Sequence, residues 1–425
     1  MFTGGRHPLA AGYVAVAGIL LVACGTESSV TPSENYTASS TTASSTTASA
    51  SSATASAAAS AAEVTITPIV GTVLHEPVPV PATDGRTHLV YEVELTNATS
   101  QNMTVREAVV RADGEELLTL DAEALPQWMR VFGQPEPTAT FGPGQAGRLW
   151  LDVALDEGAT APSSLEHVLT VIPETPSDPL LPETITETVA PVAVSTRTPI
   201  EVAPPVRGPG WLDGNGCCVV SAHRGAVSPL AGQFWAAERF AIDYVQLDAD
   251  GKLYVGDVTR NESYPYFGAD ILAAGDGPVV AVVDDLPEQT PGSNPSGLKV
   301  TEYAGNHVVQ DLGNGNYALY AHLQPGSITV QPGDSLTRGQ SIAKLGNSGN
   351  SSAAHLHFHV MDGPDPLASN GLPFVFSAFD LTGQVVGDDS IEELERTGGP
   401  VPTSTTETGR RTGELPLYLD VTTFD

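Results

Sequence analysis

A cluster of three histidines carries the densest potential for chemistry in the chain. His355, His357 and His359 occupy alternate positions, directly after a Gly/Asn/Ser-rich loop at residues 346–350. The stretch 355–361 is expected to form a strand, on which alternate side chains share one face. The backbones of His355 and His357 would then lie about 6–7 Å apart. One imidazole could bind a metal ion while the other acts on bound water or on a substrate.

The sequence before this cluster predicts the strands that would position it. Asn314-Gly315 separates two apolar runs at 307–312 and 317–323, which is a strong hairpin signal. His322 stands near the end of the second run. A Gly-Asp turn and a Gly-Gln strand follow before the histidine cluster, at 333–334 and 339–346.

In this order, the segments closely resemble the lysostaphin-type zinc peptidases, which cut peptidoglycan cross-links. The hallmarks of that family are a hairpin ending in Tyr-x-His-Leu, a Gly-Asp turn, a Gly-Gln strand, a Gly-rich loop and His-Leu-His-Phe, and all are present. The stretch 272–280 also resembles the second strand pair of the family. The resemblance covers about 120 residues, from near Asp243 to Met361.

The resemblance implies a role for each matching residue. His357 and Asp243 would bind Zn²⁺, and His322 and His355 would be the catalytic histidines. One of these two would assist deprotonation of a metal-bound water, and the other would stabilise the developing oxyanion. Zinc with three protein ligands keeps a position for that water and lowers its pKa toward neutrality. The implied activity is that of a zinc metalloendopeptidase hydrolysing peptidoglycan peptides in cell-wall remodelling.

Arg239 departs from the family pattern, which has a histidine ligand four residues before the aspartate. A guanidinium stays protonated and cannot bind zinc. Residues 210–242 contain a single histidine, His223, and we predict that a neighbouring strand delivers it as the third metal ligand. His359 is the other candidate, but its place beyond His357 favours a role in the wall of the groove. The alternative function is a degenerate domain that binds cell wall or regulates another hydrolase.

The N-terminal segment predicts export. Arg6 and His7 precede an apolar run at 9–23, the arrangement of a secretory signal. Its end, Leu21-Val22-Ala23-Cys24-Gly25, resembles the lipobox of bacterial lipoproteins, in which the cysteine is lipidated and becomes the mature N-terminus. Several acyl chains on Cys24 would anchor the chain stably. We therefore expect a signal peptide at 1–23 and an extracytoplasmic protein, lipid-anchored to the cell membrane.

The composition restricts the partners and the chemistry further. The chain has 425 residues, of which 50 are acidic and 18 basic, for a net charge of −32. Nucleic-acid binding needs a basic face and is excluded on this ground. Adjacent Cys217 and Cys218 lie closer than the usual disulfide span, about 3.8 Å between Cα atoms across a trans peptide. We interpret them as a structural pair in an oxidising compartment, with a separate metal site together with His223 as the alternative.

Composition also divides the chain into segments. Residues 24–62 form an Ala/Ser/Thr linker that is expected to be disordered, because it lacks large apolar side chains to offset the entropy of ordering. Residues 173–209 are expected to form a stiffer Pro/Thr-rich linker, and residues 386–425 a C-terminal tail, whose short apolar run at 415–419 could return to pack on a domain.

The two remaining segments predict a mainly β protein. Residues 63–172 contain runs in which apolar and polar residues alternate, for example at 89–96 and 149–155, separated by turn signals. This pattern indicates an immunoglobulin-like β-sandwich, which would serve as a spacer or binding domain. Residues 210–385 are expected to form an antiparallel β-sheet, metallopeptidase-like domain with a groove.

Overall fold

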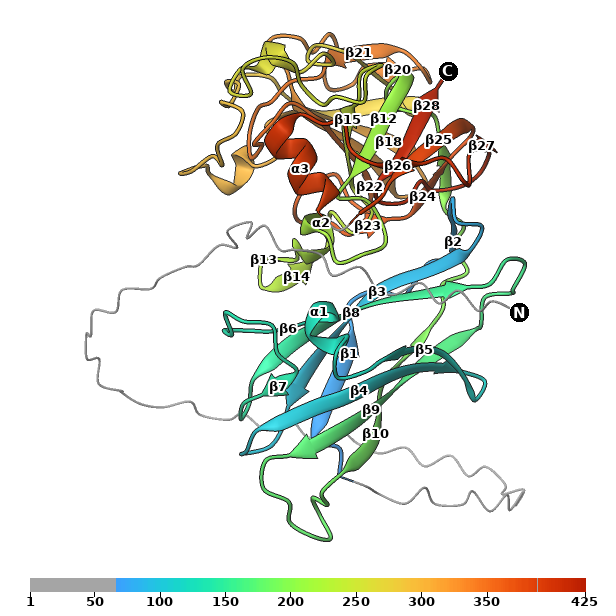
Figure 1. Cartoon of the computed structure of the whole chain (residues 1–425), viewed down its shortest axis with the longest axis vertical. Coiled ribbons are helices and arrows are strands. Elements are labelled where there is room, and N and C mark those ends of the chain that lie inside the picture. The colour runs from blue at the N-terminus through green and yellow to red at the C-terminus, as the bar shows by residue number, and fades with distance from the viewer. Residues whose placement is uncertain (1–65, 388) are drawn as a thin grey trace, which may run out of the picture. The chain divides into compact units, whose positions relative to one another are not determined.

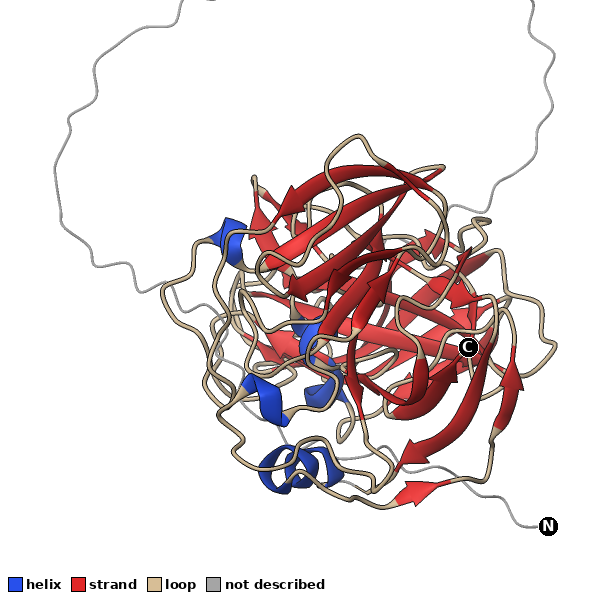
Figure 2. Cartoon of the chain, turned by 90° about the horizontal axis from the view of Figure 1, so that it is seen from above, coloured by secondary structure: helices blue, strands red, loops and turns tan. Residues whose placement is uncertain are grey.

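A computed structural model describes residues 66–387 and 389–425, whose course is shown in Figure 1. The predicted signal peptide, Cys24 and the linker 24–62 lie outside these residues. Residues 67–425 form one compact unit. Strands far exceed helices in the described chain, and the helices are few and short (Figure 2), so the mainly β fold is confirmed. Within the described residues, no helix is long and apolar enough to cross a membrane.

The N-terminal part is a sandwich of two five-stranded sheets. Its elements are β1 (Ile69–Val73), β2 (Val80–Pro81), β3 (Thr87–Asn97), β4 (Met103–Ala112), β5 (Glu115–Leu120), α1 (Leu125–Trp128), β6 (Met129–Val131), β7 (Thr140–Phe141), β8 (Ala146–Leu155), β9 (Ser164–Pro173) and β10 (Ile185–Ala193). One sheet has the order β1-β3-β8-β6 with β2 beside β3. The other has the order β10-β9-β4-β5 with β7 beside β4.

The predicted alternation is found on β3 and β8, which pair along their length. Leu89, Tyr91 and Val93 face the interior of the sandwich and belong to its hydrophobic core. The intervening residues Val90 and Glu92 are buried as well. A β-sandwich normally leaves the outer face of each sheet wet. Burial on both faces therefore shows that another part of the chain covers the middle of β3.

The segment 173–209 is not the free linker that its composition predicted. Its residues 185–193 form β10, which pairs antiparallel with β9 and extends the sandwich. Ile185 and Val189 alternate with polar residues and are buried. The proline at 191 is compatible with this place, because β10 is an edge strand and an edge strand does not need every N–H. The Pro- and Thr-rich composition of the segment concealed the period-two alternation that indicates a strand at 185–189.

The C-terminal part is built around a twelve-stranded sheet. Its main path is β20-β17-β18-β19-β22-β15-β12-β28-β25-β26, with β23 beside β22 and β27 beside β25. The bounds are β12 (Gly208–Gly214), β15 (Ile242–Gln246), β17 (Gly277–Val283), β18 (Asn306–Gly313), β19 (Asn316–Leu323), β20 (Ser335–Leu336), β22 (Leu356–Met361), β23 (Gly371–Leu372), β25 (Phe379–Val385), β26 (Thr403–Ser404), β27 (Gly409–Arg411) and β28 (Asp420–Phe424).

Short pairs and helices complete this part. The pairs are β11 (Ile200–Val202) with β24 (Phe374–Phe376), β13 (Ser228–Leu230) with β14 (Gln233–Trp235), and β16 (Asp270–Leu272) with β21 (Ser341–Lys344). The helices are α2 (Ala222–Gly225), α3 (Ser390–Thr397) and two 3₁₀ turns, Asn261–Ser263 and Val300–Glu302. Because β11 pairs with β24, the C-terminal part already begins within the segment predicted as a linker.

The last forty residues are not a tail. They contain α3 and three strands, and β28 lies between β12 and β25 within the large sheet. Val421 and Phe424 belong to the same hydrophobic core as β12 and β22. The Gly/Pro/Thr-rich stretch before β28 masked this strand in the sequence, because the stretch itself has no apolar period.

The predicted hairpin positions the histidine-bearing strands. Asn314 and Gly315 join β18 to β19 with positive φ angles of 54° and 69°, as a two-residue hairpin turn requires. β19 pairs with β22, and β22 pairs with β15. Leu356 and Phe358 point into the main core. The intervening His357 and His359 therefore occupy the opposite face of the sheet, beside a small apolar cluster that includes Leu319 and Met361.

Candidate metal centre

Asp243 on β15 and His357 on β22 lie directly opposite each other in the strand pairing. Residues paired in this way point their side chains to the same face of a sheet. The Nδ1 atom of His357 lies 3.0 Å from Oδ1 of Asp243. The backbone register of two neighbouring strands thus places one imidazole nitrogen beside one carboxylate oxygen.

His223 completes a group of three potential ligands. Its Nε2 atom lies 3.1 Å from Oδ2 of Asp243, and its ring meets the ring of His357 edge-on, with 4.7 Å between centroids. The expectation that a strand delivers His223 is wrong, because it lies in the one-turn helix α2. Ser221 caps this turn by accepting a hydrogen bond from the backbone N–H of Arg224.

The donor atoms fit a zinc ion. One ligand atom from each of His223, Asp243 and His357 lies within 4.8 Å of the others, and two imidazoles with one carboxylate form a donor set that Zn²⁺ accepts. Nδ1 of His223 lies 3.0 Å from the backbone oxygen of Ala241, to which an Nδ1–H would donate. Asn215 donates to Oδ2 of Asp243 over 2.9 Å. Such partners orient ligands and fix the tautomer that leaves a lone pair for the metal.

His359 contacts the ring nitrogen of His357 that faces away from Asp243, and it is not part of a groove wall. It is fully buried, and its Nδ1 lies 2.9 Å from Nε2 of His357. If Nε2 of His357 carries the proton, it donates to His359 and leaves Nδ1 free to bind metal on the side of Asp243. The sequence placed His359 on the correct face. Only the structure shows that it contacts the ligand from the rear, because that contact depends on both χ angles.

His322 and His355, the predicted catalytic pair, also lie beside His357, and Nε2 of His355 is 3.3 Å from Oδ1 of Asp243. Their ring centroids are 4.7 Å apart, and the ring of His322 is 5.7 Å from that of His357. Nδ1 of His322 faces the backbone oxygen of Ser348 over 2.7 Å, and Nδ1 of His355 faces that of Ala353 over 2.9 Å. With Nδ1–H donating to a carbonyl, each ring presents Nε2 to the site.

The charges of the cluster divide the histidines into two kinds. Burial would lower the pKa of His223, but the adjacent Asp243 carboxylate outweighs it and raises that pKa to about 9. Burial would also lower the pKa of His355, but the Asp243 carboxylate outweighs it and raises this pKa above its ordinary value. Burial together with the neighbouring His355 and His357 lowers the pKa of His322 well below that value. The two predicted catalytic histidines thus have pKa values pushed apart.

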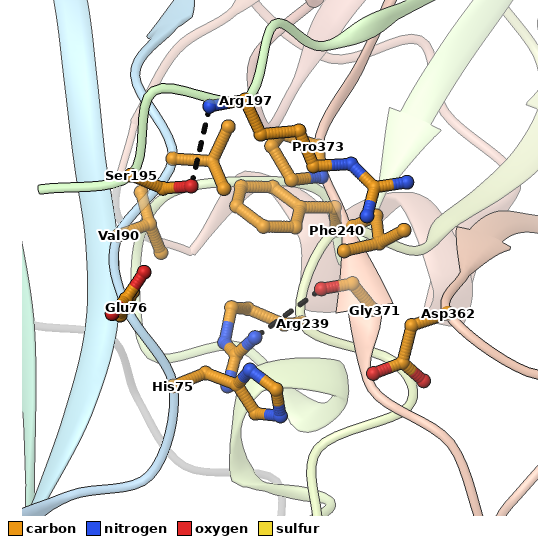
Figure 3. Close-up of a pocket in the computed structure, with 12 residues that line it drawn as sticks. His75, Glu76, Val90, Ser195, Arg197, Arg239, Phe240, Asp362, Gly371 and Pro373 are labelled. Atoms are coloured by element: carbon orange, nitrogen blue, oxygen red, sulfur yellow. Dashed lines mark hydrogen bonds between the residues drawn. The ribbon is translucent and has the colours of Figure 1, made fainter. Parts of the chain in front are cut away.

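Arg239 does not enter the metal centre. Its guanidinium donates to both carboxylate oxygens of Glu92 on β3, with Nε 2.8 Å from Oε2 and 3.1 Å from Oε1. A further hydrogen bond runs from Nη1 to the backbone oxygen of Gly371, over 3.2 Å. Figure 3 shows Arg239 lining a pocket together with His75 and Asp362. The residue at the usual histidine position is therefore turned toward the sandwich.

Cys217 and Cys218 form a disulfide with each other. The sulfur of Cys218 also lies near His88 and Asp152, a combination of residue types that can hold a metal. Because a disulfide sulfur offers no thiolate, this group is not a second metal centre, and neither cysteine is grouped with His223. The pair is structural, as the sequence analysis expected.

Part of the chain matches known peptidases. Residues 264–369 match the model of peptidase family M23, so the chain contains an M23 peptidase domain. A stretch of 59 residues is 41% identical to the peptidoglycan DD-endopeptidase ShyA of Vibrio cholerae serotype O1. That stretch is 14% of this chain and spans only 13% of the length of the relative.

Solved structures match larger parts of the chain. The catalytic domain of lysostaphin from Staphylococcus simulans is 18% identical, with 39% of this chain and 88% of that chain covered and a TM-score of 0.21. A mutant catalytic domain of the prophage-encoded M23 protein EnpA from Enterococcus faecalis is 20% identical, with 42% and 95% covered and a TM-score of 0.22.

Proposed function

We propose that this chain, which carries an M23 peptidase domain at 264–369, is a zinc-dependent endopeptidase that hydrolyses peptide cross-links of peptidoglycan. The observation that carries the proposal is the arrangement of five side chains: the potential ligands His223, Asp243 and His357, with His322 and His355 beside them, a pair that can also group with His357 around a metal. The similarity to the peptidoglycan DD-endopeptidase of Vibrio supports peptidoglycan peptides as the substrate class.

The residues divide the work as follows. His223, Asp243 and His357 would hold Zn²⁺, which supplies a water of lowered pKa and polarises the scissile carbonyl. His322, which the site keeps neutral, accepts the proton of the attacking water at Nε2. His355, whose pKa is raised, donates a hydrogen bond from Nε2 to the developing oxyanion. Proton acceptance and oxyanion stabilisation thereby fall to two rings in contact with each other.

The alternative of a degenerate binding domain depended on Arg239. Its side chain is engaged by Glu92 and Gly371, and His223 offers the ligand atom that Arg239 cannot. The site also keeps both flanking histidines, for which a domain that only binds cell wall has no chemical use. These observations favour the enzyme.

The purified full chain tests this function. We expect about one zinc per chain and release of peptide fragments from at least one type of purified peptidoglycan, with release lost on removal of zinc by a chelator and restored by its return. His75→Ala is a suitable control, since His75 lies in the pocket beside Arg239 and not among the ligands. A chain that binds zinc and wall but cuts no peptidoglycan type would establish the binding function instead.

We further propose that the chain is a lipoprotein anchored through Cys24. The support is the lipobox-like sequence at the end of the apolar N-terminal run. A Cys24→Ser variant is expected to leave the membrane fraction or to keep an uncleaved signal. Fractionation and processing identical to those of the parent chain would contradict the anchor without affecting the peptidase.

A further inference from the structure

The sandwich presents a fully buried carboxylate to the C-terminal part of the chain, which carries the proposed catalytic site and is therefore the catalytic part. Glu92 lies in the middle of β3, opposite Trp150 on β8, on the face that points away from the core of the sandwich. Val90, on the same face, belongs to the hydrophobic core of the catalytic part. Glu92 has no exposed surface. The charged side chains within hydrogen-bond distance of its carboxylate come from the catalytic part.

These side chains are two arginines, and each lies next to the metal centre in sequence. Arg239 precedes Asp243 by four residues and holds Glu92 through Nε and Nη2. Arg224 directly follows His223, and its Nη2 lies 3.4 Å from Oε1 of Glu92. Burial would raise the pKa of Glu92, but the charges of Arg239 and Arg224 outweigh it and lower that pKa. The carboxylate is thus ionised between two cations.

The contacts to Arg224 hold the backbone as well as the side chain. Its Nη2 is also within 3.3 Å of the backbone oxygen of Tyr91 and 3.4 Å of that of Leu151, on the two paired strands. The indole Nε1 of Trp150 donates to the backbone oxygen of Arg224 over 2.8 Å. The sandwich therefore contacts both the guanidinium and the backbone oxygen of Arg224, the residue beside His223.

Besides the Ser221 cap and the contact of His223 with Ala241, the helix that carries His223 depends on the contacts of Arg224 for its position. It has four residues, α2, and a helix this short is only marginally stable by itself. His223 and Arg224 are consecutive, so their side chains leave the turn in different directions, one toward Asp243 and one toward Glu92. Movement of the Arg224 end would displace the imidazole of His223 from the metal centre.

We propose that Glu92 and Trp150 of the sandwich are positioning residues for the metal centre, because through Arg224 they hold α2 where His223 can reach the metal, a role that rests on the proposed function of His223 as a ligand. The sandwich is then a structural part of the peptidase site. Arg239 stands where the family has a histidine ligand, and it binds the same Glu92 carboxylate. This ion pair attaches the segment before Asp243 to the sandwich.

Two variants of the full chain test this role by zinc affinity, measured in competition with a chromophoric chelator. Glu92→Gln removes the charge that both arginines share. Arg224→Met removes the contacts of the guanidinium with the sandwich and its hydrogen bond to the backbone oxygen of Cys218. The remaining Glu92–Arg239 pair is electrically neutral, so this variant is expected to fold. Loss of a residue that orients a metal ligand typically weakens metal binding about 10–100-fold, and we expect this range for both. The visible spectrum of the cobalt(II)-substituted chain should change as His223 leaves the metal.

Glu187→Gln is the matched control, because Glu187 is another buried carboxyl group of the sandwich and contacts Ile69 within it. This variant should keep the zinc affinity of the parent within about twofold. If Glu92→Gln does not fold, Arg224→Met decides. A folded Arg224→Met chain with parental zinc affinity and cobalt spectrum would overturn the positioning role.

A further variant separates this proposal from the function on which it rests. If His223→Ala weakens zinc binding while Arg224→Met does not, only the positioning role fails. If His223→Ala binds zinc as tightly as the parent, the assignment of the third ligand fails, and the positioning role fails with it.

Discussion

His322 reaches the ring of His355 because the backbone of β19 is irregular at that residue. Ala321 pairs with His357 across β19 and β22, so regular alternation would turn the next residue to the opposite face of the sheet. His322 instead has a positive φ of 60°, and the pairing of β18 with β19 changes register there. A bulge of this kind re-aims a side chain. It brings the imidazole of His322 within 4.7 Å of that of His355.

Substitution of His322 or His355 by Ala is expected to abolish most activity and leave zinc in place. Their proposed work is proton acceptance and oxyanion stabilisation, and loss of a positioned acid or base group costs roughly 10²–10⁴-fold in rate. Substitution of His357 or Asp243 by Ala should instead remove the metal. Peptide release and zinc content, measured on the same preparations, separate the two classes. Zinc loss in the first pair would mean that those residues are ligands.

His223→Ala should lower the zinc content as His357→Ala does. With Asp243 and His357 alone, two protein ligands would remain, fewer than the three usual at catalytic zinc sites. Equilibrium dialysis against buffered zinc measures the change, with His75→Ala as the comparison. If His75→Ala and His223→Ala retain equal amounts of zinc, a residue other than His223 completes the site.

His359→Phe is expected to weaken zinc binding by about 10–100-fold, although His359 does not touch the metal. Phe fills the space but offers no acceptor to Nε2 of His357, so the tautomer that frees Nδ1 loses its support. His359→Gln, whose amide oxygen can accept, should lose less. Equal affinities for the two variants would show that the contact between His357 and His359 has no effect on the ligand.

The stability of the sandwich should fall between about pH 6.5 and pH 9. His88 is buried between Asp152, 2.8 Å from its Nδ1, and Asp84, 3.3 Å from its Nε2. Burial alone would lower its pKa, but these carboxylates outweigh it and raise the pKa to about 9. A raised pKa contributes stability below the unfolded value, and that contribution is lost as the pH rises through the folded value.

The shift corresponds to about 3 kcal/mol, since each pKa unit is worth about 1.4 kcal/mol. Urea unfolding of the parent chain and of His88→Gln at pH 6 and pH 9.5 measures it. The stability difference between parent and variant should shrink by about that amount at the higher pH. A difference that is the same at both pH values would show that His88 is not charged in the folded chain.

Much of the catalytic part follows from local sequence. The Asn314-Gly315 turn specifies its hairpin because both positions need positive φ. Period-two alternation puts His357 and His359 on one face of β22. The same rules failed for β10 and β28, where Pro, Thr and Gly dominate the composition but pairing with neighbouring strands decides the structure.

The chemistry of the site was determined by residue type, and its geometry by tertiary contacts. That Arg239 cannot bind zinc follows from its guanidinium alone. Arg239 and Arg224 both pair with Glu92, which lies far earlier in the chain. These ion pairs depend on packing between the sandwich and the catalytic part. No sequence period encodes such a contact, because a buried ion pair forms only where two folded surfaces exclude water. The same packing holds the turn that presents His223 to Asp243.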